Sequence, residues 1–298
     1  VLLAGDVPGL TLSLTRARIA IVEDAADSAL VAADAGVNWN DFVHWTLGRG
    51  LCGLENLALI PGTVGASPIQ NIGAYGTEVG EFIESVQAFD RETLRLREFE
   101  REDCRFGYRD SVFKRAPDQN VITEVRFRLP KSRAVRTSYA GVDEELAAMG
   151  VDGAPTHRQV AEAISRLRAR KLPNPAVLGN AGSFFKNPIV EAAVAEALKA
   201  AHPALPVFPG DSATTRKLSA GWLIDAAGWK GFRDGDAGVA PQHALVLVNH
   251  GHATGADLLA LAGRIAGSVQ ARFGVALEPE PRIVGGRFAP VPPSEANA

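Results

Sequence analysis

The decapeptide Gly179-Asn180-Ala181-Gly182-Ser183-Phe184-Phe185-Lys186-Asn187-Pro188 places one hydroxyl between a flexible Gly/Asn run and two aromatic rings. Glycines let a backbone approach a ligand closely. Two adjacent phenylalanines can fix such a loop against a core, so that Ser183 is held in place. The alternative is a buried turn whose serine hydrogen-bonds its own backbone. The stretch alone leaves both interpretations open.

The composition is that of a globular protein with about two domains. The chain has 298 residues, of which 46% are hydrophobic and 22% are charged. A formal net charge of −3 argues against a nucleic-acid partner. Two cysteines, Cys52 and Cys104, suffice for neither a disulfide framework nor a four-thiolate metal site. No apolar run is long enough to span a membrane, so we expect a cytoplasmic protein without membrane partner or metal.

The sequence predicts mainly strands in the first half of the chain. Short runs that are rich in β-branched residues, or in which apolar and polar residues alternate, are separated by turns. A segment that could be helical, with Trp39 and Trp45, interrupts them. The expected strands are residues 10–14, 17–22, 85–89, 94–99 and 121–129.

The second half reads as α+β. A helix is predicted over 157–171, with Thr156 and Gln159 as a capping box. Another is predicted over 257–273, with Thr254 as cap and Gly274 as terminator. Further helices are expected at 190–200 and 218–227, and strands at 244–248 and 277–284. The domains predicted are 1–172, 173–285 and a disordered, proline-rich tail over 286–298.

The loop from Ile60 to Gly76 is rich in glycine, serine, threonine and side-chain amides. Such a loop can wrap a phosphate or a flat heterocycle with its main-chain N–H groups. It is neither a P-loop nor a dinucleotide fingerprint. A long hairpin connection is the alternative.

Two further clusters combine arginine with carboxylates. Arg109 lies between Tyr108 and Asp110, where a guanidinium can orient a carboxylate or a developing oxyanion. On an extended segment, Glu278, Glu280 and Arg282 would point to one side, and one carboxyl could be a proton donor. An ordinary surface ion pair and a charged strand edge are the respective alternatives.

Taken together, these stretches resemble the UDP-N-acetylenolpyruvoylglucosamine reductase (MurB) family of peptidoglycan precursor synthesis, in its type I branch. The resemblance extends in consistent order over nearly the whole chain. Its motifs are residues 53–57, 60–76, 104–114, 171–173, 179–188, 220–225 and 277–282.

The resemblance implies a flavin reductase. NADPH would reduce bound FAD, and hydride would then pass to the vinyl carbon of UDP-N-acetylglucosamine enolpyruvate. Arg109 and Glu280 would stabilise the enolate that forms, and Ser183 would give a proton to its α-carbon. Serine is a weak acid and therefore needs tight placement. Glu280 would have to be protonated, or paired with Arg282, to help an anion.

The same resemblance assigns a fold and binding residues. It implies an FAD-binding domain of the PCMH type, lacking its N-terminal Gly-rich pyrophosphate loop, followed by an α+β substrate domain. We expect a monomer. Substrate contacts are implied for Tyr75, Tyr139, Lys171, Asn187, Gln242 and Arg282, and cofactor contacts for Pro61, Gly62, Thr63, Gly65, Ala66, Gln70, Asn71 and Gly73.

Two other functions stay open. The first is a different FAD oxidoreductase that uses the same flavin domain. The second is a nucleotide-sugar-binding protein without turnover, because the expected pyrophosphate loop is missing. One departure from the family pattern is Pro281, which stands where valine is usual and removes a backbone donor beside Glu280.

Overall fold

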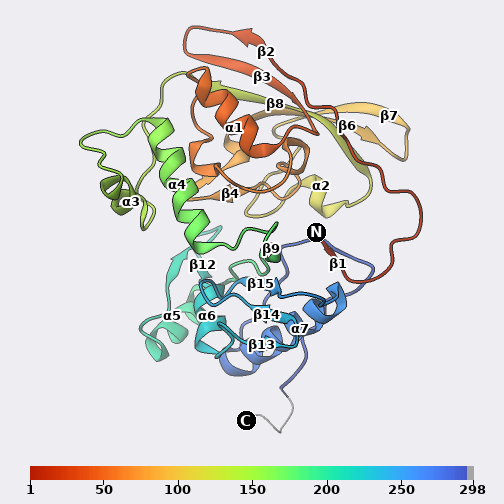
Figure 1. Ribbon diagram of the computed structural model, residues 1–298, viewed down its shortest axis with the longest axis vertical. Helices are drawn as coiled ribbons and strands as arrows, with labels where there is room; N and C mark the ends of the chain where they lie inside the picture. Colours follow the sequence, from red (N-terminus) through yellow and green to blue (C-terminus); the bar gives the residue numbers. More distant parts are fainter. Residues whose placement is uncertain (294–298) are drawn as a thin grey trace. The chain divides into compact units, whose positions relative to one another are not determined.

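The computed structural model describes residues 1–293, and the chain divides into two compact units. One unit is Thr11–Arg168, and the other joins Val1–Leu10 to the chain from Ala169 onward (Figure 1). The division lies within the last turn of a helix, a few residues before the boundary expected at 172/173. The first ten residues group with the C-terminal unit, whereas the sequence had placed them in the first domain.

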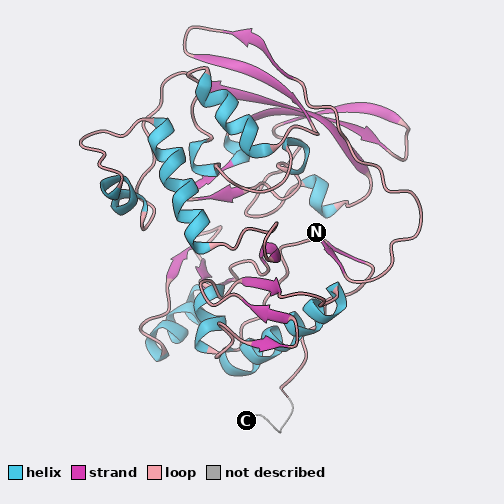
Figure 2. Cartoon of the chain, viewed as in Figure 1, coloured by secondary structure: helices cyan, strands magenta, loops and turns pink. Residues whose placement is uncertain are grey.

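The Thr11–Arg168 unit is built on a five-stranded antiparallel sheet with the order β2-β3-β8-β6-β7 (Figure 2). In β6 and β8, alternating side chains are buried over much of the strand, as the period of a half-buried strand requires. The expected strands 17–22, 85–89, 94–99 and 121–129 are thereby confirmed. The observed bounds are β2 Ile19–Asp24, β3 Ser28–Asp34, β6 Ile83–Asp90, β7 Arg95–Glu100 and β8 Asn120–Pro130.

Helices α1 (Trp39–Gly48) and α4 (His157–Lys171) contribute buried side chains to the core of this unit. Trp39 is almost fully buried and donates its indole N–H to the Leu57 carbonyl. Thr156 and the Gln159 side chain bond each other at the start of α4, so the predicted capping box is present. The shorter elements are η1 Glu55–Leu57, η2 Val64–Ala66, β4 Gly73–Ala74, β5 Thr77–Glu78, η3 Val79–Glu81, α2 Val112–Arg115 and α3 Val142–Ala148.

The prediction of a strand at residues 10–14 is wrong. The segment has no regular structure, and Leu10 and Leu12 are 85% and 80% exposed. Alternating leucines make a strand only where a neighbouring strand pairs their backbone and a core covers one face. Regular pairing begins later, where Asp34 of β3 accepts the Arg18 N–H and β2 starts.

The other unit has a larger sheet of order β13-β14-β15-β9 and a smaller one of order β10-β12-β11. Helix α7 (Gly255–Phe273) has the predicted Thr254 cap, and Gly274 ends it in the left-handed conformation. The expected helices are confirmed as α5 Ala192–Ala201 and α6 Ala220–Ala226. The strands are β9 Gly179–Ser183, β10 Ile189–Glu191, β11 Val207–Pro209, β12 Thr215–Leu218, β13 Arg233–Asp234, β14 Ala237–Val239 and β15 Val246–Asn249.

The strand expected over 277–284 is only partly formed. Pro279 makes an isolated bridge to Phe185, and a regular strand, β16 (Ile283–Val284), begins only afterwards. It pairs in parallel with β1 (Leu2–Leu3). The two prolines that flank Glu280 have no N–H to donate, which interrupts the ladder.

The tail is ordered at its start, which corrects the disorder expected from residue 286. Phe288 packs against the core of the second unit, with its ring 6.1 Å from that of Phe185. The Val291 N–H donates to the Gly263 carbonyl of α7 at 2.9 Å. We call residues 286–293 the strap. Residues 294–298 of the predicted tail lie outside the described part of the chain.

Candidate functional site

The predicted catalytic residues are divided between the two units, Arg109 in one and Ser183 with Glu280 in the other. In the first unit, Arg109 sits in a tight turn closed by mutual backbone hydrogen bonds between Gly107 and Asp110. Its φ of 53° lies in the left-handed region, which is unfavourable for a residue with a side chain. Such local strain persists only where surrounding contacts fix the turn.

Those contacts tie Arg109 to the glycine-rich loop. Its Nη2 donates to the Gly73 carbonyl, and the Lys114 ammonium donates to the carbonyl of Arg109 itself. A Cβ on Gly73 would lie 2.7 Å from Arg109 Nη1, so the guanidinium would have to shift from this position. The structure thus brings together a predicted cofactor loop and a predicted catalytic arginine.

Within the loop, the predicted cofactor residues differ in what they offer a ligand. Gly62 and Thr63 are exposed, and among residues 1–293 their N–H groups donate to no backbone carbonyl. Gly65, in contrast, is buried, donates to the Ala35 carbonyl, and has no room for a Cβ beside Ala35. Pro61 and Ala66 are exposed and Gln70 is half-buried.

Asn71 is committed to the protein itself. Its side chain is buried, donates to the Glu78 carboxylate and the Gly107 carbonyl, and accepts the Gly80 N–H. These bonds fasten the loop to the turn that carries Arg109. The amide therefore shapes the predicted cofactor site rather than offering its own polar atoms to a ligand.

The N–H groups of Gly62 and Thr63, which donate to no backbone carbonyl within residues 1–293, provide a test of whether FAD fits. Successive main-chain N–H groups without protein acceptors suit an anionic group such as a pyrophosphate. Glycine at position 62, with φ 121°, leaves room for the ligand to approach the backbone. The residues present in this loop are compatible with the flavin cofactor that the sequence implied.

Two predicted substrate residues, Tyr75 and Tyr139, meet in the same unit. Their ring centroids are 5.1 Å apart at 68°, an edge-to-face geometry. Tyr139 is 51% exposed, so the pair can meet a ligand.

Arg168 of α4 is a residue that the sequence analysis missed. It interacts electrostatically with Tyr75 and Arg109, and burial lowers the pKa of its guanidinium. Its Nε donates to the Leu59 carbonyl. The sequence shows it only as one of several arginines on a helix, and nothing there distinguishes it.

In the second unit, backbone pairing brings the segments of Ser183 and Glu280 together. The Glu280 N–H donates to the Phe184 carbonyl at 2.7 Å, and the Lys186 N–H donates to the Glu278 carbonyl at 3.0 Å. Phe184 and Phe185 are buried, as expected, with their rings edge to face. Ser183 therefore ends a strand whose continuation is anchored in the core.

Glu278 and Glu280 do not behave as the matched pair that the sequence suggested. Glu278 is exposed and forms an ion pair with Lys186 at 3.2 Å. Glu280 is half-buried, while Arg282 is exposed and accepts the Leu2 N–H at its carbonyl. The difference follows from the interrupted strand, which breaks the alternation of side chains.

The remaining predicted substrate residues occupy three places in this unit. Asn187 accepts the Ala220 N–H and so caps α6 together with Ser219. Gln242 is exposed, next to His243. Burial lowers the pKa of His243, and the charge of Lys171 lowers it further, which places Lys171 near the Gln242 loop.

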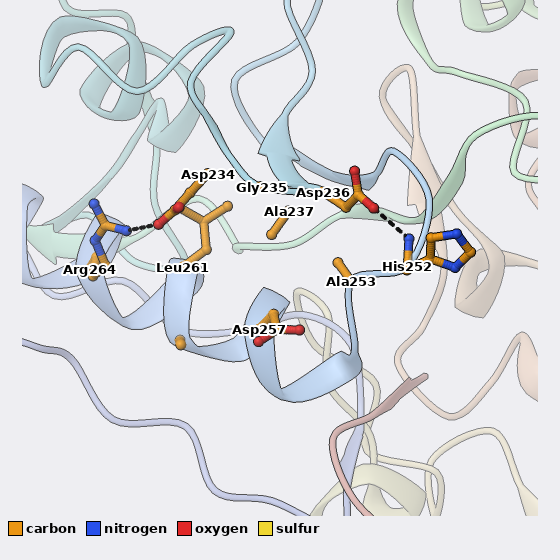
Figure 3. A pocket seen from close by; sticks show the side chains of 10 residues that line it. Asp234, Gly235, Asp236, Ala237, His252, Ala253, Asp257, Leu261 and Arg264 are labelled. Atoms are coloured by element: carbon orange, nitrogen blue, oxygen red, sulfur yellow. Dashed lines mark hydrogen bonds and ion pairs between the residues drawn. The ribbon is translucent and has the colours of Figure 1, made fainter.

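A pocket of about 380 Å³ lies elsewhere in this unit (Figure 3). Asp234 pairs with Arg264, and Asp236 accepts the His252 N–H. Asp257 caps α7 at Thr254. The lining of this pocket includes none of the predicted site residues. The carboxylates of Asp234, Asp236 and Asp257 all have partners in the described chain. Among residues 1–293, no group of three histidine, cysteine or acidic side chains is placed to hold a metal ion.

Comparisons with known proteins give matches to both the N-terminal and the C-terminal part of the chain. Residues 2–93 match the sequence profile of an FAD binding domain, and residues 174–284 that of the UDP-N-acetylenolpyruvoylglucosamine reductase C-terminal domain. The chain is 56% identical over 288 residues to the UDP-N-acetylenolpyruvoylglucosamine reductase of Xanthomonas euvesicatoria pv. vesicatoria (strain 85-10), covering 97% of this chain and 82% of that protein. It is 54% identical, with the same coverage, to that of Xylella fastidiosa (strain 9a5c).

A solved structure is also similar. The crystal structure of UDP-N-acetylenolpyruvylglucosamine reductase (MurB) from Thermus caldophilus matches with a TM-score of 0.55 and 25% identity. The match covers 84% of this chain and 70% of that one. Within the described residues, no helix is both long and apolar enough to cross a membrane.

Proposed function

Because this chain belongs to the UDP-N-acetylenolpyruvoylglucosamine reductase family, we propose that it reduces UDP-N-acetylglucosamine enolpyruvate to UDP-N-acetylmuramate at the expense of NADPH. The reaction is a step of peptidoglycan precursor synthesis, and we place the enzyme in the cytoplasm as a monomer. The residues that the sequence singled out then have distinct tasks.

The glycine-rich loop would hold the cofactor. Gly62 and Thr63 offer main-chain N–H groups, with Pro61, Ala66, Gln70 and Gly73 alongside them and with Gly65 and Asn71 supporting the loop from within. FAD, when bound, takes hydride from NADPH and supplies it to the vinyl carbon of the substrate. Because the loop is fastened to the Arg109 turn, cofactor and arginine would keep a fixed relation.

Arg109 would bind the carboxylate of the substrate and stabilise the charge that grows on it. Hydride arrives as a nucleophile, so the electron pair of the double bond moves onto the carboxyl side as an enolate. A guanidinium keeps its positive charge under all relevant conditions and presents a rigid fork to two oxygens. The hydrogen bond from Arg109 Nη2 to the Gly73 carbonyl fixes the orientation of the guanidinium.

Ser183 would then deliver a proton to the α-carbon, and Glu280 would help to stabilise the enolate. Protonation of an enolate at carbon is slow, so the donor needs a fixed position. The observation that carries the proposal is the hydrogen bond between the Glu280 N–H and the Phe184 carbonyl. It joins two segments distant in sequence and sets both side chains on one anchored framework.

A two-step assay on the full chain tests the proposal. With FAD added, anaerobic NADPH should bleach the flavin absorbance near 450 nm, and the enolpyruvyl substrate should restore it. Ser183→Ala should leave the bleaching unchanged and slow the restoration by roughly 10²–10⁴-fold, the usual contribution of a positioned acid. Within residues 1–293 the Ser183 hydroxyl makes no hydrogen bond to another protein group, so the variant should fold normally.

The matched control is Ser268→Ala, a half-buried serine of α7 in the same unit. Restoration at the wild-type rate in the Ser183 variant would refute the assigned role. Bleaching without any restoration by the wild-type chain would instead indicate another FAD oxidoreductase. A chain that binds the nucleotide sugar but no flavin would indicate binding without turnover.

A further inference from the structure

Ser111 directly follows the turn that carries Arg109, and its side chain is fully buried. Its hydroxyl donates to the Ile69 carbonyl at 2.5 Å, across 42 residues of sequence. Within residues 1–293, the Ile69 carbonyl accepts no backbone N–H. The serine side chain therefore provides the bond that joins the turn to the glycine-rich loop at this point.

The other end of the turn is bonded to the same loop. The side-chain amide of Asn71 donates to the Gly107 carbonyl at 3.0 Å, two residues before Arg109, and Ser111 lies two residues after it. The loop thus bonds the turn on one side, and the turn bonds the loop on the other. Between these bonds, Arg109 has its φ of 53°. A residue with a Cβ relaxes from this conformation unless the surrounding structure holds the turn.

Other contacts of the turn fix its internal shape. The Asp110 carboxylate pairs with Arg115 at 2.6 Å, and the Lys114 ammonium donates to the Arg109 carbonyl at 3.1 Å. These contacts connect residues 109–115 to one another, so they do not set the position of the turn against the loop. The guanidinium of Arg109 does reach Gly73, but it stands at the end of a long, flexible side chain. Its position therefore depends on a fixed backbone, which the bonds of Asn71 and Ser111 provide.

We propose that Ser111 is a positioning residue that, together with Asn71, holds the Arg109 turn against the cofactor loop and so fixes where the guanidinium meets the substrate carboxylate. This inference rests on the proposed function, in which Arg109 stabilises the enolate. Donors stabilise a developing charge best when they are in place before the reaction. A misplacement of about 1 Å can cost about 100-fold in rate. Ser111 acts through the backbone of Arg109 and needs no contact with the substrate.

Separate kinetics of the two half-reactions test the proposal in the full chain with FAD. In Ser111→Ala, NADPH should bleach the flavin at the wild-type rate, because the role of Arg109 begins only with the substrate. Restoration of the flavin absorbance by the enolpyruvyl substrate should slow about tenfold, equivalent to ~1.4 kcal/mol.

The matched control is Ser85→Ala, the same substitution in the main sheet of the same unit. Ser85 is buried, and its hydroxyl donates to the Glu98 carboxylate at 2.7 Å. The control therefore also loses the hydrogen bond of a buried serine, but one that joins β6 to β7. Both half-reactions should keep their wild-type rates in this variant.

A double variant shows whether Ser111 acts through Arg109. In an Arg109→Ala background, Ser111→Ala should change the restoration rate less than about twofold, because the group that it positions is gone. A further tenfold loss in that background would overturn the proposal, as would wild-type restoration in the single variant. Bleaching that slows as much as restoration would also overturn it, since general damage affects both steps. Should Ser111→Ala fail to fold, Ser111→Cys carries the same comparison with a weaker donor.

Hydrogen–deuterium exchange gives a readout that needs neither FAD nor turnover. The N–H groups of Gly107 and Asp110 each donate to the carbonyl of the other at 3.1 Å, so a loosened turn should expose both to exchange. Amides of residues 105–112 should exchange faster in Ser111→Ala than in the wild type or in Ser85→Ala. Equal exchange would refute the positioning role. Faster exchange in Ser111→Ala, with a wild-type chain that binds FAD but does not turn over the substrate, would refute the proposed function and support the link between turn and loop.

Discussion

Replacing Gly255 with alanine should detach the first strand from the C-terminal unit. A Cβ at this first residue of α7 would lie 1.7 Å from the Leu3 carbonyl oxygen and 2.5 Å from its carbon. Contacts this short between a Cβ and backbone cannot be relieved by a side-chain rotation. Either β1 or the start of α7 must therefore move.

The magnitude follows from what β1 contributes. The Leu2 N–H donates to the Arg282 carbonyl and the Ala4 N–H to the Val284 carbonyl, each at 2.8 Å. Two such bonds are worth about 1 kcal/mol each. Burial of the Leu2 side chain, which is 8% exposed, adds about 1.5–3 kcal/mol. The higher helix propensity of alanine offsets at most about 1 kcal/mol of this loss. The free energy of unfolding of the unit should therefore fall by about 2.5–4 kcal/mol.

Urea unfolding, followed by tryptophan fluorescence, measures this loss. Trp222 and Trp229 lie in the affected unit and report on its unfolding. Gly221→Ala is the matched control, since its nearest neighbour would be Leu245 Cγ at 3.7 Å, an ordinary contact. A Gly255→Ala variant whose unfolding free energy stays within about 0.5 kcal/mol of the wild type would refute the packing of β1 on α7.

Two further predictions concern the same unit. Gly267→Ala should release the strap from α7, because the new Cβ would lie 1.7 Å from the Val291 carbonyl oxygen. Trypsin should then cleave after Arg287 faster than in the wild type. An unchanged cleavage rate would contradict this prediction. His243 has a pKa lowered from 6.5, mainly by burial and then by nearby lysine charges. The contribution of neutral His243 to the free energy of unfolding is therefore fully present above about pH 6.5. It is lost as the pH falls toward the pKa of the histidine in the folded state. Urea midpoints between pH 7 and pH 5 should fall less in His243→Gln, and equal slopes would exclude this histidine as the cause.

The helices could be predicted from local sequence because their signals are local. Thr254 and Gly274 mark the ends of α7, and the capping box at Thr156 marks the start of α4. A cap needs only the few residues around it, so tertiary context has little to change. Strands β6 and β8 were predictable for a similar reason, since the alternation of their side chains matches one buried face.

The errors arose where partners distant in sequence decide the outcome. The leucines at 10–14 alternate as in a strand, but no strand within residues 1–293 pairs with them. The strap has the composition of a disordered tail, yet Gly263 and Gly267 leave a groove on α7 that its backbone fills. Neither outcome can be read from the segment itself, because both depend on what another part of the chain presents.

The sequence by itself determined the α+β class, the family and the identity of the candidate residues, because these depend on motifs that occur together in a fixed order. Only the tertiary structure decided which polar groups are committed to the protein. The side-chain amides of Asn71 and Asn56, for example, are buried and hydrogen-bonded to other groups of the protein. Such partners lie up to 80 residues apart. Hydrogen bonding depends on distance and direction in space, and the order of residues along the chain does not fix either.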